Sequence, residues 1–322
     1  MEEAALSELA RRRPRRLSWV ATAALLVMGA SGTDSCCNGE GSALQSTIES
    51  AQTEGFLGAD DFEGDSQGQP QEVEYGGQAT YLGRVVFLHL ARTTVDDVLP
   101  EELELAPNLS ATLPERHPVV LLVGHQTETQ LVYPFWTPQV GEDYREVILM
   151  IPFVRKTGGY YWHNYIVRMY LEDFEATVLG NQYYGLQKIQ ADFAETPDTL
   201  EVILNSISMF TLKATPNGDW LSDAEAEAAL SNYTQMKEIV GMPILGRLDY
   251  MIGKPFICSY FEWTLDAAQV RPITATARFV QPFVTGMASW QALGDIPSVA
   301  DGAWEIEELR WRIGYPPFGC GF

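Results

Sequence analysis

The chain has 322 residues and a formal net charge of −22 at pH 7, and this length allows one large domain or two modest ones. Hydrophobic residues make up 46% of it and aromatic residues 11%, which is enough apolar surface for a sizeable core. The negative charge argues against a nucleic-acid-binding protein, because phosphate binding requires clustered lysine and arginine side chains. It also does not suit an anionic membrane surface.

The N-terminal segment has the pattern of an export signal. Five arginines between Arg11 and Arg16 precede the apolar stretch Trp19–Ala30, and small residues follow it. Because this stretch is short for a bilayer-spanning helix, residues 1–35 are expected to be a signal peptide or export segment. An uncleaved anchor and a basic tail are the alternatives. The protein is therefore expected to be exported, to the periplasm or to the outer membrane.

The four cysteines leave alternatives open. Cys36 and Cys37 lie where a bacterial lipoprotein carries its lipidated cysteine, so tethering to a membrane could occur there, although residues 33–35 depart from the lipoprotein pattern. Cys258 and Cys320 could pair in an oxidising compartment, or remain a buried thiol and a tail thiol. The chain has no CxxC motif and only four scattered histidines, so no zinc site is expected.

Composition divides the rest of the chain into a linker and a folded part. Residues 36–78 are rich in Gly, Ser, Gln, Asp and Glu and are predicted to be a disordered acidic linker. From residue 79 onward, short apolar runs such as HPVVLLVGH and EVILMIPFV alternate with turn residues, as is typical of strands. Residues 79–318 are therefore expected to form one domain, followed by a short tail at residues 319–322.

Few helices are expected in this domain. One is predicted in TTVDDVLPEEL, with Thr94 as its cap and Pro100 as its stop. Another is predicted in SDAEAEAALSNYTQMK, where Ser222 and Glu225 form a capping box. The fold class is thus mainly β (α+β). With so many strands, an antiparallel sheet closed into a barrel or cone and flanked by a few helices is the expected architecture.

The sequence contains none of the common catalytic motifs for phosphate binding, serine nucleophiles or metal binding, namely GxxxxGK, GxSxG and HExxH. No metal ion and no cofactor are therefore expected. What remains is one unusual region, which runs through DYREVILMIPF and GGYYWHNYIVRMYLEDFEATVLGN to QYYGLQKIQADF.

This region resembles the acetoacetate decarboxylase-like family. In that family a Glu-led strand ends in a proline, a Gly-rich turn leads into a Tyr-bearing strand, and a glycine precedes the Schiff-base lysine by eight positions. The corresponding residues here are Glu146, Pro152, Gly158, Gly159, Gly180 and Lys188. Upstream, YLGRVVFLHLA looks like the family's opening strand, with Arg84 at the position of its pocket arginine. Downstream, FVTGMASWQAL also resembles the family, so the resemblance covers nearly the whole folded region.

Lys188 is the candidate nucleophile. A lysine with an unperturbed pKa is neutral in only about one molecule in 2,500 at pH 7, so it reacts poorly until its ammonium form is destabilised. Leu186, Ile189 and the two tyrosines before them give Lys188 an apolar neighbourhood, and burial there would lower its pKa. The structural alternative is a surface lysine at the start of a strand.

The resemblance implies roles for further residues. A neutral Lys188 amine would attack a ketone and form an imine, Arg84 would hold a carboxylate, and Glu146 would move protons or set the local field. Alternatively, Arg84 is a solvated residue on an edge strand and Glu146 belongs to a cross-strand pair. Four aromatic residues are expected to line the substrate pocket: Tyr160, Trp162, Tyr183 and Tyr184.

The sequence departs from the family's pattern at three places. Gln187 stands where the family has a proline, and Ile189 where it has a second lysine, so desolvation must lower the pKa of Lys188 without an adjacent positive charge. A second pocket glutamate has no counterpart between Val119 and Val123, and His125 or Glu128 could replace it.

The leading hypothesis is an exported enzyme that forms a Schiff base between Lys188 and a small keto acid, with decarboxylation as the first guess for the reaction and aldol or dehydration chemistry as alternatives. The second hypothesis is a non-catalytic small-molecule binding protein on the same scaffold. A tethered surface protein is a weaker third. The family tends to assemble, so a homo-oligomer is one possible state of this chain, but the sequence leaves the oligomeric state open.

Overall fold

The computed structural model describes residues 74–107, 115–131, 143–248, 256–284, 286–315 and 320. These residues belong to one compact unit, Pro70–Phe322. The predicted export segment, the cysteine pair at positions 36 and 37 and most of the predicted linker lie outside the described residues. None of the helices among the described residues is long and apolar enough to cross a membrane.

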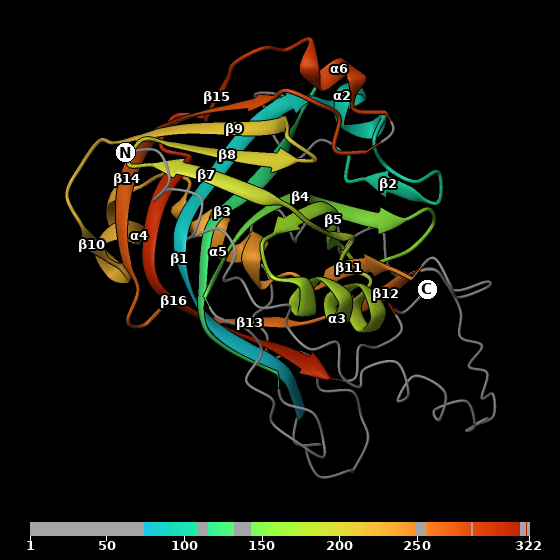
Figure 1. Ribbon diagram of the computed structural model, residues 1–322, viewed down its shortest axis with the longest axis horizontal. Coiled ribbons are helices and arrows are strands. Elements are labelled where there is room, and N and C mark those ends of the chain that lie inside the picture. Colours follow the sequence, from blue (N-terminus) through green and yellow to red (C-terminus); the bar gives the residue numbers. More distant parts are fainter. Residues whose placement is uncertain are drawn as a thin grey trace, which may run out of the picture. The chain divides into compact units, whose positions relative to one another are not determined.

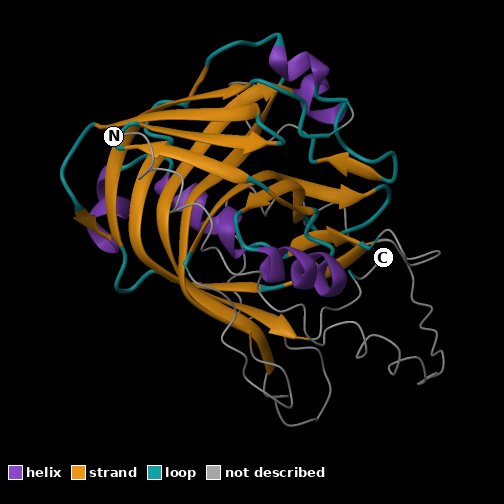
Figure 2. Ribbon diagram, viewed as in Figure 1, coloured by secondary structure: helices purple, strands orange, loops and turns teal. Residues whose placement is uncertain are grey.

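Strands form most of the described chain (Figure 2). The first eight are β1 (Glu74–Ala91), β2 (Leu103–Leu105), β3 (Arg116–Leu131), β4 (Tyr144–Lys156), β5 (His163–Leu171), β6 (Lys188–Gln190), β7 (Asp192–Thr196) and β8 (Thr199–Leu204). They are followed by β9 (Ile207–Pro216), β10 (Leu221–Ser222), β11 (Ile244–Arg247), β12 (Phe256–Ser259), β13 (Phe261–Thr264), β14 (Gln269–Phe279), β15 (Ile296–Pro297) and β16 (Ala303–Tyr315).

Short helices accompany the strands. They are α2 (Arg92–Asp96), α3 (Phe174–Tyr184), α4 (Asp223–Ala229), α5 (Tyr233–Gly241) and α6 (Ala288–Gln291). In Figure 1, α2 and α6 lie together at one end of the sheet, and α3 lies near β11 and β12. The predicted mainly β class with a few helices is confirmed.

The strands follow the order β12-β11-β5-β4-β3-β1-β16-β14-β9-β8-β7 in one curved sheet (Figure 1). Most neighbours are antiparallel, as predicted, but β6 and β11 each run parallel to β5. The expected closure into a barrel or cone is wrong for the described residues, because the terminal strands β12 and β7 do not pair with each other. Edge strands therefore remain.

The central strands are buried on both faces. On β3, Val119, Leu121 and Val123 belong to one apolar cluster, which also contains residues of β8, β9 and β14. Val120 and Leu122 belong to a second cluster, which also contains residues of α4 and α5. Because successive side chains of a strand point to opposite faces, a run such as VVLLV contributes to both clusters. These clusters are called the first and the second core below.

Three local predictions need correction. β1 begins at Glu74, inside the segment that was expected to be a linker. The helix expected around Thr94 is the single turn α2, which begins at Arg92 and ends before Pro100. The capping box of Ser222 and Glu225 is present as predicted, but it starts α4, and a separate helix, α5, follows.

Cys258 and Cys320 form a disulfide, with their Cα atoms 5.1 Å apart and a sequence separation of 62 residues. It joins β12 to the C-terminal end of the described chain. His163 lies beside the two sulfur atoms, within 4.8 Å. Because metal binding by cysteine requires a free thiolate, the bonded sulfur atoms cannot serve as ligands.

We expect the Cys258→Ala, Cys320→Ala double variant to have a free energy of unfolding about 2–4 kcal/mol lower than the original chain, because the cross-link restricts the unfolded state. Urea denaturation without reductant measures the difference. Reductant should lower the midpoint of the original chain and leave that of the double variant unchanged. Equal midpoints without reductant would contradict the prediction.

Candidate active site

Lys188 is the first residue of β6, and the preceding helix α3 holds it in place. Asn181 in α3 accepts a hydrogen bond from the Lys188 backbone N–H at 2.6 Å and donates one from its side chain to the Lys188 carbonyl at 2.8 Å. The side chain of Asp173 caps the start of the same helix by accepting from the Ala176 N–H. The backbone of Lys188 is thus fixed against both the helix and β5.

Gly180 explains why a glycine occurs eight residues before the lysine. A Cβ atom at this position would lie 2.6 Å from both Cδ and Cε of Lys188 and 2.9 Å from Nζ. The lysine side chain therefore lies directly across the backbone of α3, in space that any other residue would occupy. The spacing noted in the sequence has a steric cause.

The backbone between helix and lysine also explains the missing proline. Gly185 ends α3 in the left-handed region with a φ of 59°, and Gln187 has a φ of 55°. Because proline is restricted to a φ near −65°, it cannot occupy position 187 in this conformation. The Gln187 side chain instead donates to the Arg247 carbonyl at 3.0 Å.

The two residues after Gln187 face opposite sides of the sheet. Ile189 packs against the first core, whereas Lys188 lines a cavity of the second.

The cavity beside Lys188 has a volume of about 70 Å³ and mostly apolar walls. Its polar lining includes Lys188, Glu146, Gln126, Asn164, Tyr144 and Thr129, and Tyr184 also borders it. Glu146, Ile148 and Met150 are two residues apart along β4, so they share one face of the strand, and all three line the cavity. Strand alternation thus places the carboxylate among apolar side chains.

Burial shifts the pKa values of the two charged groups in opposite directions. Desolvation lowers the pKa of Lys188, and the negative charges of Glu146 and Asp173 partly offset this. Desolvation raises the pKa of the Glu146 carboxyl, while Lys188 and a hydrogen bond from Gln126 oppose that shift. Both shifts favour the neutral forms. Although part of the Lys188 residue is exposed, its amine is the buried end.

Gln126 and Trp311 form a buried chain of hydrogen bonds that ends at Glu146. The Trp311 indole N–H donates to Gln126 Oε1 at 2.7 Å, and the Gln126 amide N–H₂ donates to Glu146 Oε1. Because an indole can only donate, it fixes the orientation of the amide and directs its N–H₂ group at the carboxylate. Sequence reasoning missed both residues. The signal for Gln126 was its place on the strand where a second pocket glutamate was sought.

The two suggested replacements for that glutamate are elsewhere. His125 contacts Glu195 at 3.0 Å, and Glu128 accepts a hydrogen bond from Thr80 at 3.3 Å. Neither lines the cavity beside Lys188. The polar side chains that β3 contributes to the cavity are instead those of Gln126 and Thr129, and both are uncharged.

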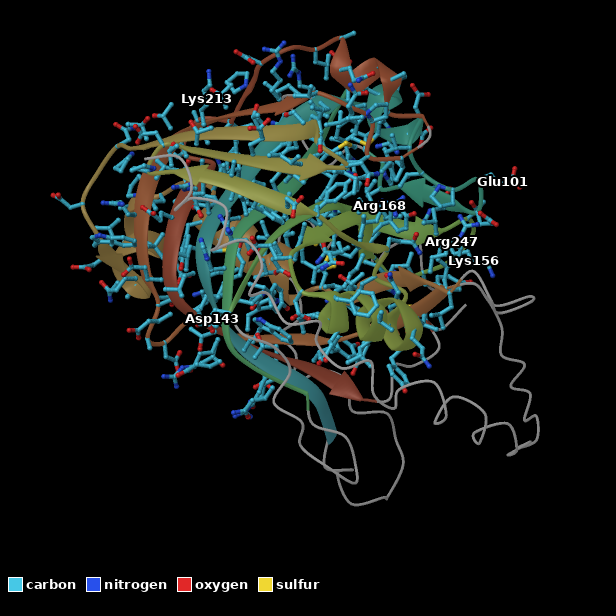
Figure 3. The ribbon with its side chains drawn as sticks, in the orientation of Figure 1. Glu101, Asp143, Lys156, Arg168, Lys213 and Arg247 are labelled. Atoms are coloured by element: carbon cyan, nitrogen blue, oxygen red, sulfur yellow. A yellow bond between two sulfur atoms is a disulfide. The ribbon has the colours of Figure 1, made fainter. Side chains whose placement is uncertain are left out.

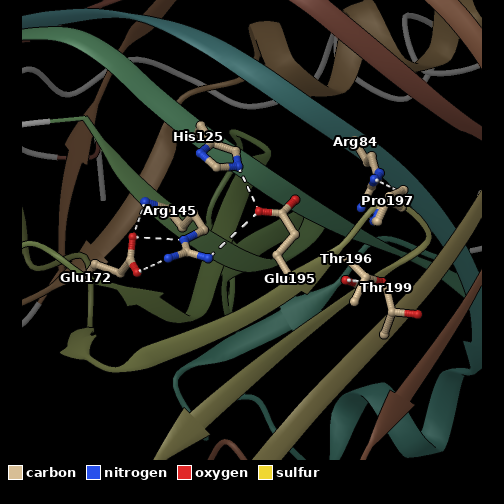
Figure 4. A network of polar contacts seen from close by, with 8 residues as sticks. All are labelled: Arg84, His125, Arg145, Glu172, Glu195, Thr196, Pro197 and Thr199. Atoms are coloured by element: carbon tan, nitrogen blue, oxygen red, sulfur yellow. Dashed lines mark hydrogen bonds and ion pairs between the residues drawn. The ribbon is translucent and has the colours of Figure 1, made fainter. Parts of the chain in front are cut away.

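The structure does not bring Arg84 together with Lys188. On β1, Val85 faces the second core, whereas Val86 faces the first. Arg84 lies on the same face of the strand as Val86. Its guanidinium donates to the Pro197 carbonyl at 2.9 Å, in the turn between β7 and β8 (Figure 4). Since neighbouring residues of a strand face opposite sides, Arg84 points away from the cavity.

Of the four aromatic residues expected in the pocket, only Tyr184 lines the cavity. Tyr160 is 77% exposed. Trp162 stacks under the guanidinium of Arg155, at 4.5 Å. Tyr183 is partly buried and packs against the second core without lining the cavity. The helix α3 explains the difference between the two adjacent tyrosines, because they point about 100° apart around it.

A polar network lies outside the cavity and connects the elements that carry the site (Figure 4). Arg145, the residue before Glu146, forms a two-pronged ion pair with Glu172, with contacts of 2.7 and 3.0 Å. Glu195, on β7, lies 3.9 Å from Arg145 and also contacts His125. Through Glu172 the network joins β3, β4 and β7 to the start of α3, because Glu172 directly precedes Asp173, the N-cap residue of that helix.

We expect Gly180→Ala to reduce the rate of chemical modification of Lys188 by carbonyl compounds roughly 10- to 100-fold, because the added methyl group displaces the amine. Borohydride trapping measures the rate, and urea denaturation should show a change in stability below about 1 kcal/mol. Gly241→Ala is the matched control, since a Cβ at that helical position meets nothing within 4 Å. Equal trapping rates in the two variants would contradict the assigned packing.

No protein-family model matches the chain, and no curated protein does. Among solved structures, the chain is similar to acetoacetate decarboxylase from Legionella pneumophila, with 14% identity, 80% of this chain and 92% of that chain covered, and a TM-score of 0.47. It is similar to the enduracididine biosynthesis enzyme MppR complexed with pyruvate, with 10% identity, coverage of 77% and 91%, and a TM-score of 0.45. An acetoacetate decarboxylase-like enzyme from Sphingomonas wittichii shows 12% identity, coverage of 74% and 89%, and a TM-score of 0.47. Acetoacetate decarboxylases and related enzymes, which the sequence motifs resemble, are thus also among the structures to which the chain is similar.

Proposed function

We propose that this protein is an enzyme in which the amine of Lys188 forms an imine with a small carbonyl compound. The observation that carries the proposal is a buried lysine whose pKa is lowered, on the wall of an apolar cavity that also contains one carboxylate. Lysine is almost never fully buried unless it is paired, and a lysine amine kept neutral by desolvation can attack a carbonyl group.

The geometry supports the following sequence of steps. The neutral Lys188 amine attacks the carbonyl carbon, a C–N bond forms, and the carbonyl oxygen takes up a proton. A second proton, delivered by the acid form of Glu146, lets this oxygen leave as water while the nitrogen lone pair forms the C=N bond, and the resulting protonated imine withdraws electrons from the neighbouring carbon. An enamine then forms in one of two ways: the Glu146 carboxylate removes a proton from that carbon, or a β-carboxylate leaves as CO₂. Protonation of the enamine carbon and hydrolysis by water release the product and regenerate Lys188.

The resemblance noted in the sequence implies a small keto acid as the substrate of this reaction. One of the similar solved structures is described as an acetoacetate decarboxylase and another as a complex with pyruvate, so acetoacetate and pyruvate are the first compounds to test. Decarboxylation, aldol condensation and dehydration can all start from the same imine. Imine formation is therefore the part of the proposal that depends least on the identity of the substrate.

A second candidate is a binding protein that does not catalyse a reaction. The position of Arg84 outside the cavity favours it, because the described residues that line the cavity then include no arginine, whereas the family pattern places one in the pocket. Such a protein would bind its ligand reversibly without a covalent bond to Lys188. The two candidates differ in whether an adduct can be trapped.

We expect borohydride reduction in the presence of a carbonyl substrate to attach that substrate to Lys188, as shown by peptide mass spectrometry. Lys188→Arg should abolish the adduct, because a guanidinium remains protonated and does not attack carbonyls. Lys213→Arg is the control, since Lys213 is an exposed lysine at the outer surface (Figure 3). Saturable binding without an adduct, unchanged in Lys188→Arg, would support the binding protein instead.

The rate of trapping should rise with pH and level off above the pKa of Lys188, which burial places below that of an exposed lysine. In Glu146→Gln the midpoint of this rise should move to lower pH, because the carboxylate that raises the pKa of Lys188 is lost. Glu195→Gln, in the network outside the cavity, should leave the midpoint unchanged. A midpoint that stays the same or moves upward in Glu146→Gln would contradict the pairing.

A further inference from the structure

We propose that the substrate of this site is an uncharged ketone or aldehyde with an apolar chain and a hydrogen-bond donor remote from its carbonyl group, rather than a keto acid. This inference rests on the proposed imine chemistry and specifies the class of substrate. Three features of the cavity support it: its charges, its walls and one buried amide.

The charges of the cavity are unsuited to a carboxylate. Among the described residues that line it, Lys188 is the only cation and Glu146 the only carboxylate. Once Lys188 has become a protonated imine with the substrate carbonyl, its single positive charge still interacts with Glu146, and none of the other described lining residues supplies a second cation for another charged group. Arg84, the arginine that was expected in the pocket, bonds to Pro197, and Arg145, which precedes Glu146, bonds to Glu172, both outside the cavity.

A substrate carboxylate in this cavity would therefore lie near Glu146 without a cation of its own. Burying a charge without a partner is strongly unfavourable. The residue that stands beside Glu146 is Gln126, whose amide is oriented by Trp311 and already donates to Glu146. One of its two N–H donors is thus committed to the protein's own carboxylate.

The walls suit a hydrocarbon chain. Ile148, Ile166, Met169, Leu186 and Ile244 line the cavity from β4, β5, β11 and the segment after α3. Burial of apolar surface favours binding in proportion to the area that is removed from water. The cavity should therefore bind a chain of several carbon atoms better than a compact acid.

Asn164 provides the polar feature away from Lys188. Its side chain is 1% exposed, and its Nδ2 group donates to the carbonyls of Ile239 and Met242 at the end of α5. This fixes the amide and leaves Oδ1 as a buried acceptor that has no hydrogen-bond partner. Since buried acceptors are normally satisfied, a donor on the ligand is the natural partner for this oxygen.

The positions of the two groups set the spacing between the ligand's carbonyl and its donor. Lys188 pairs with Met169 on β5, and Asn164 is five residues earlier on the same strand. At a rise of about 3.3 Å per residue these two backbone positions are at most roughly 16 Å apart, because β5 contains a bulge between them, and the Lys188 side chain spans part of this distance. The carbonyl and the donor are therefore separated by several carbon atoms.

A matched series of ligands tests the proposal on the full chain. The probes are three seven-carbon methyl ketones whose far end is a methyl group, a hydroxymethyl group or a carboxylate, together with acetoacetate. Borohydride trapping at Lys188 is measured for each at equal concentration. We expect both uncharged ketones to be trapped about tenfold or more faster than the two acids, and the hydroxyl-ended ketone roughly threefold or more faster than the methyl-ended one.

The outcomes separate this inference from the proposed function. Trapping of either acid as fast as the uncharged ketones would overturn the substrate class and leave the imine chemistry intact. Trapping of none of the four probes would refute the imine chemistry as well. In Asn164→Leu the preference for the hydroxyl group should vanish, and its persistence would refute the role of Asn164. If that variant does not fold, the comparison of the two uncharged ketones in the original chain decides the point, because equal rates would refute the donor requirement.

Discussion

The burial of the central strands on both faces is the constraint on which the rest of this structure depends. In the middle of β3, β4 and β5, alternation assigns each residue to one of two interiors. Glu146 and Gln126 face the second core, where the cavity lies, while Arg84 on β1 and Ile189 on β6 face the first. The polar content of the cavity is thus a consequence of strand register.

A competition between desolvation and pairing controls the lysine. Burial alone would drive Lys188 toward its neutral form and Glu146 toward its protonated form, and each group then partly restores the charge of the other. The chain achieves this without a neighbouring positive charge, because position 189 holds an isoleucine on the opposite face. Activation of the amine here depends on the protein interior that surrounds it.

Much of this could be predicted from the sequence because the signals were local or carried by spacing. The strands followed from apolar runs, the capping box from Ser222 and Glu225, and the pair of Lys188 and Glu146 from the order of short motifs. Arg84 shows the limit: the motif gave its position along the strand, but its face depends on a register that only the folded sheet defines. The pairing of Gln126 with Trp311 joins residues 185 apart in sequence, and no local pattern connects them.

Gly180 shows how stability and reactivity oppose each other in this chain. Glycine within a helix costs roughly 1 kcal/mol relative to alanine, and α3 has only 11 residues in which to offset it. The helix retains this weak point at the position where the lysine side chain crosses it. Directed evolution for thermal tolerance would therefore tend to select alanine at this position, and the more robust protein would have lost the space that holds its amine.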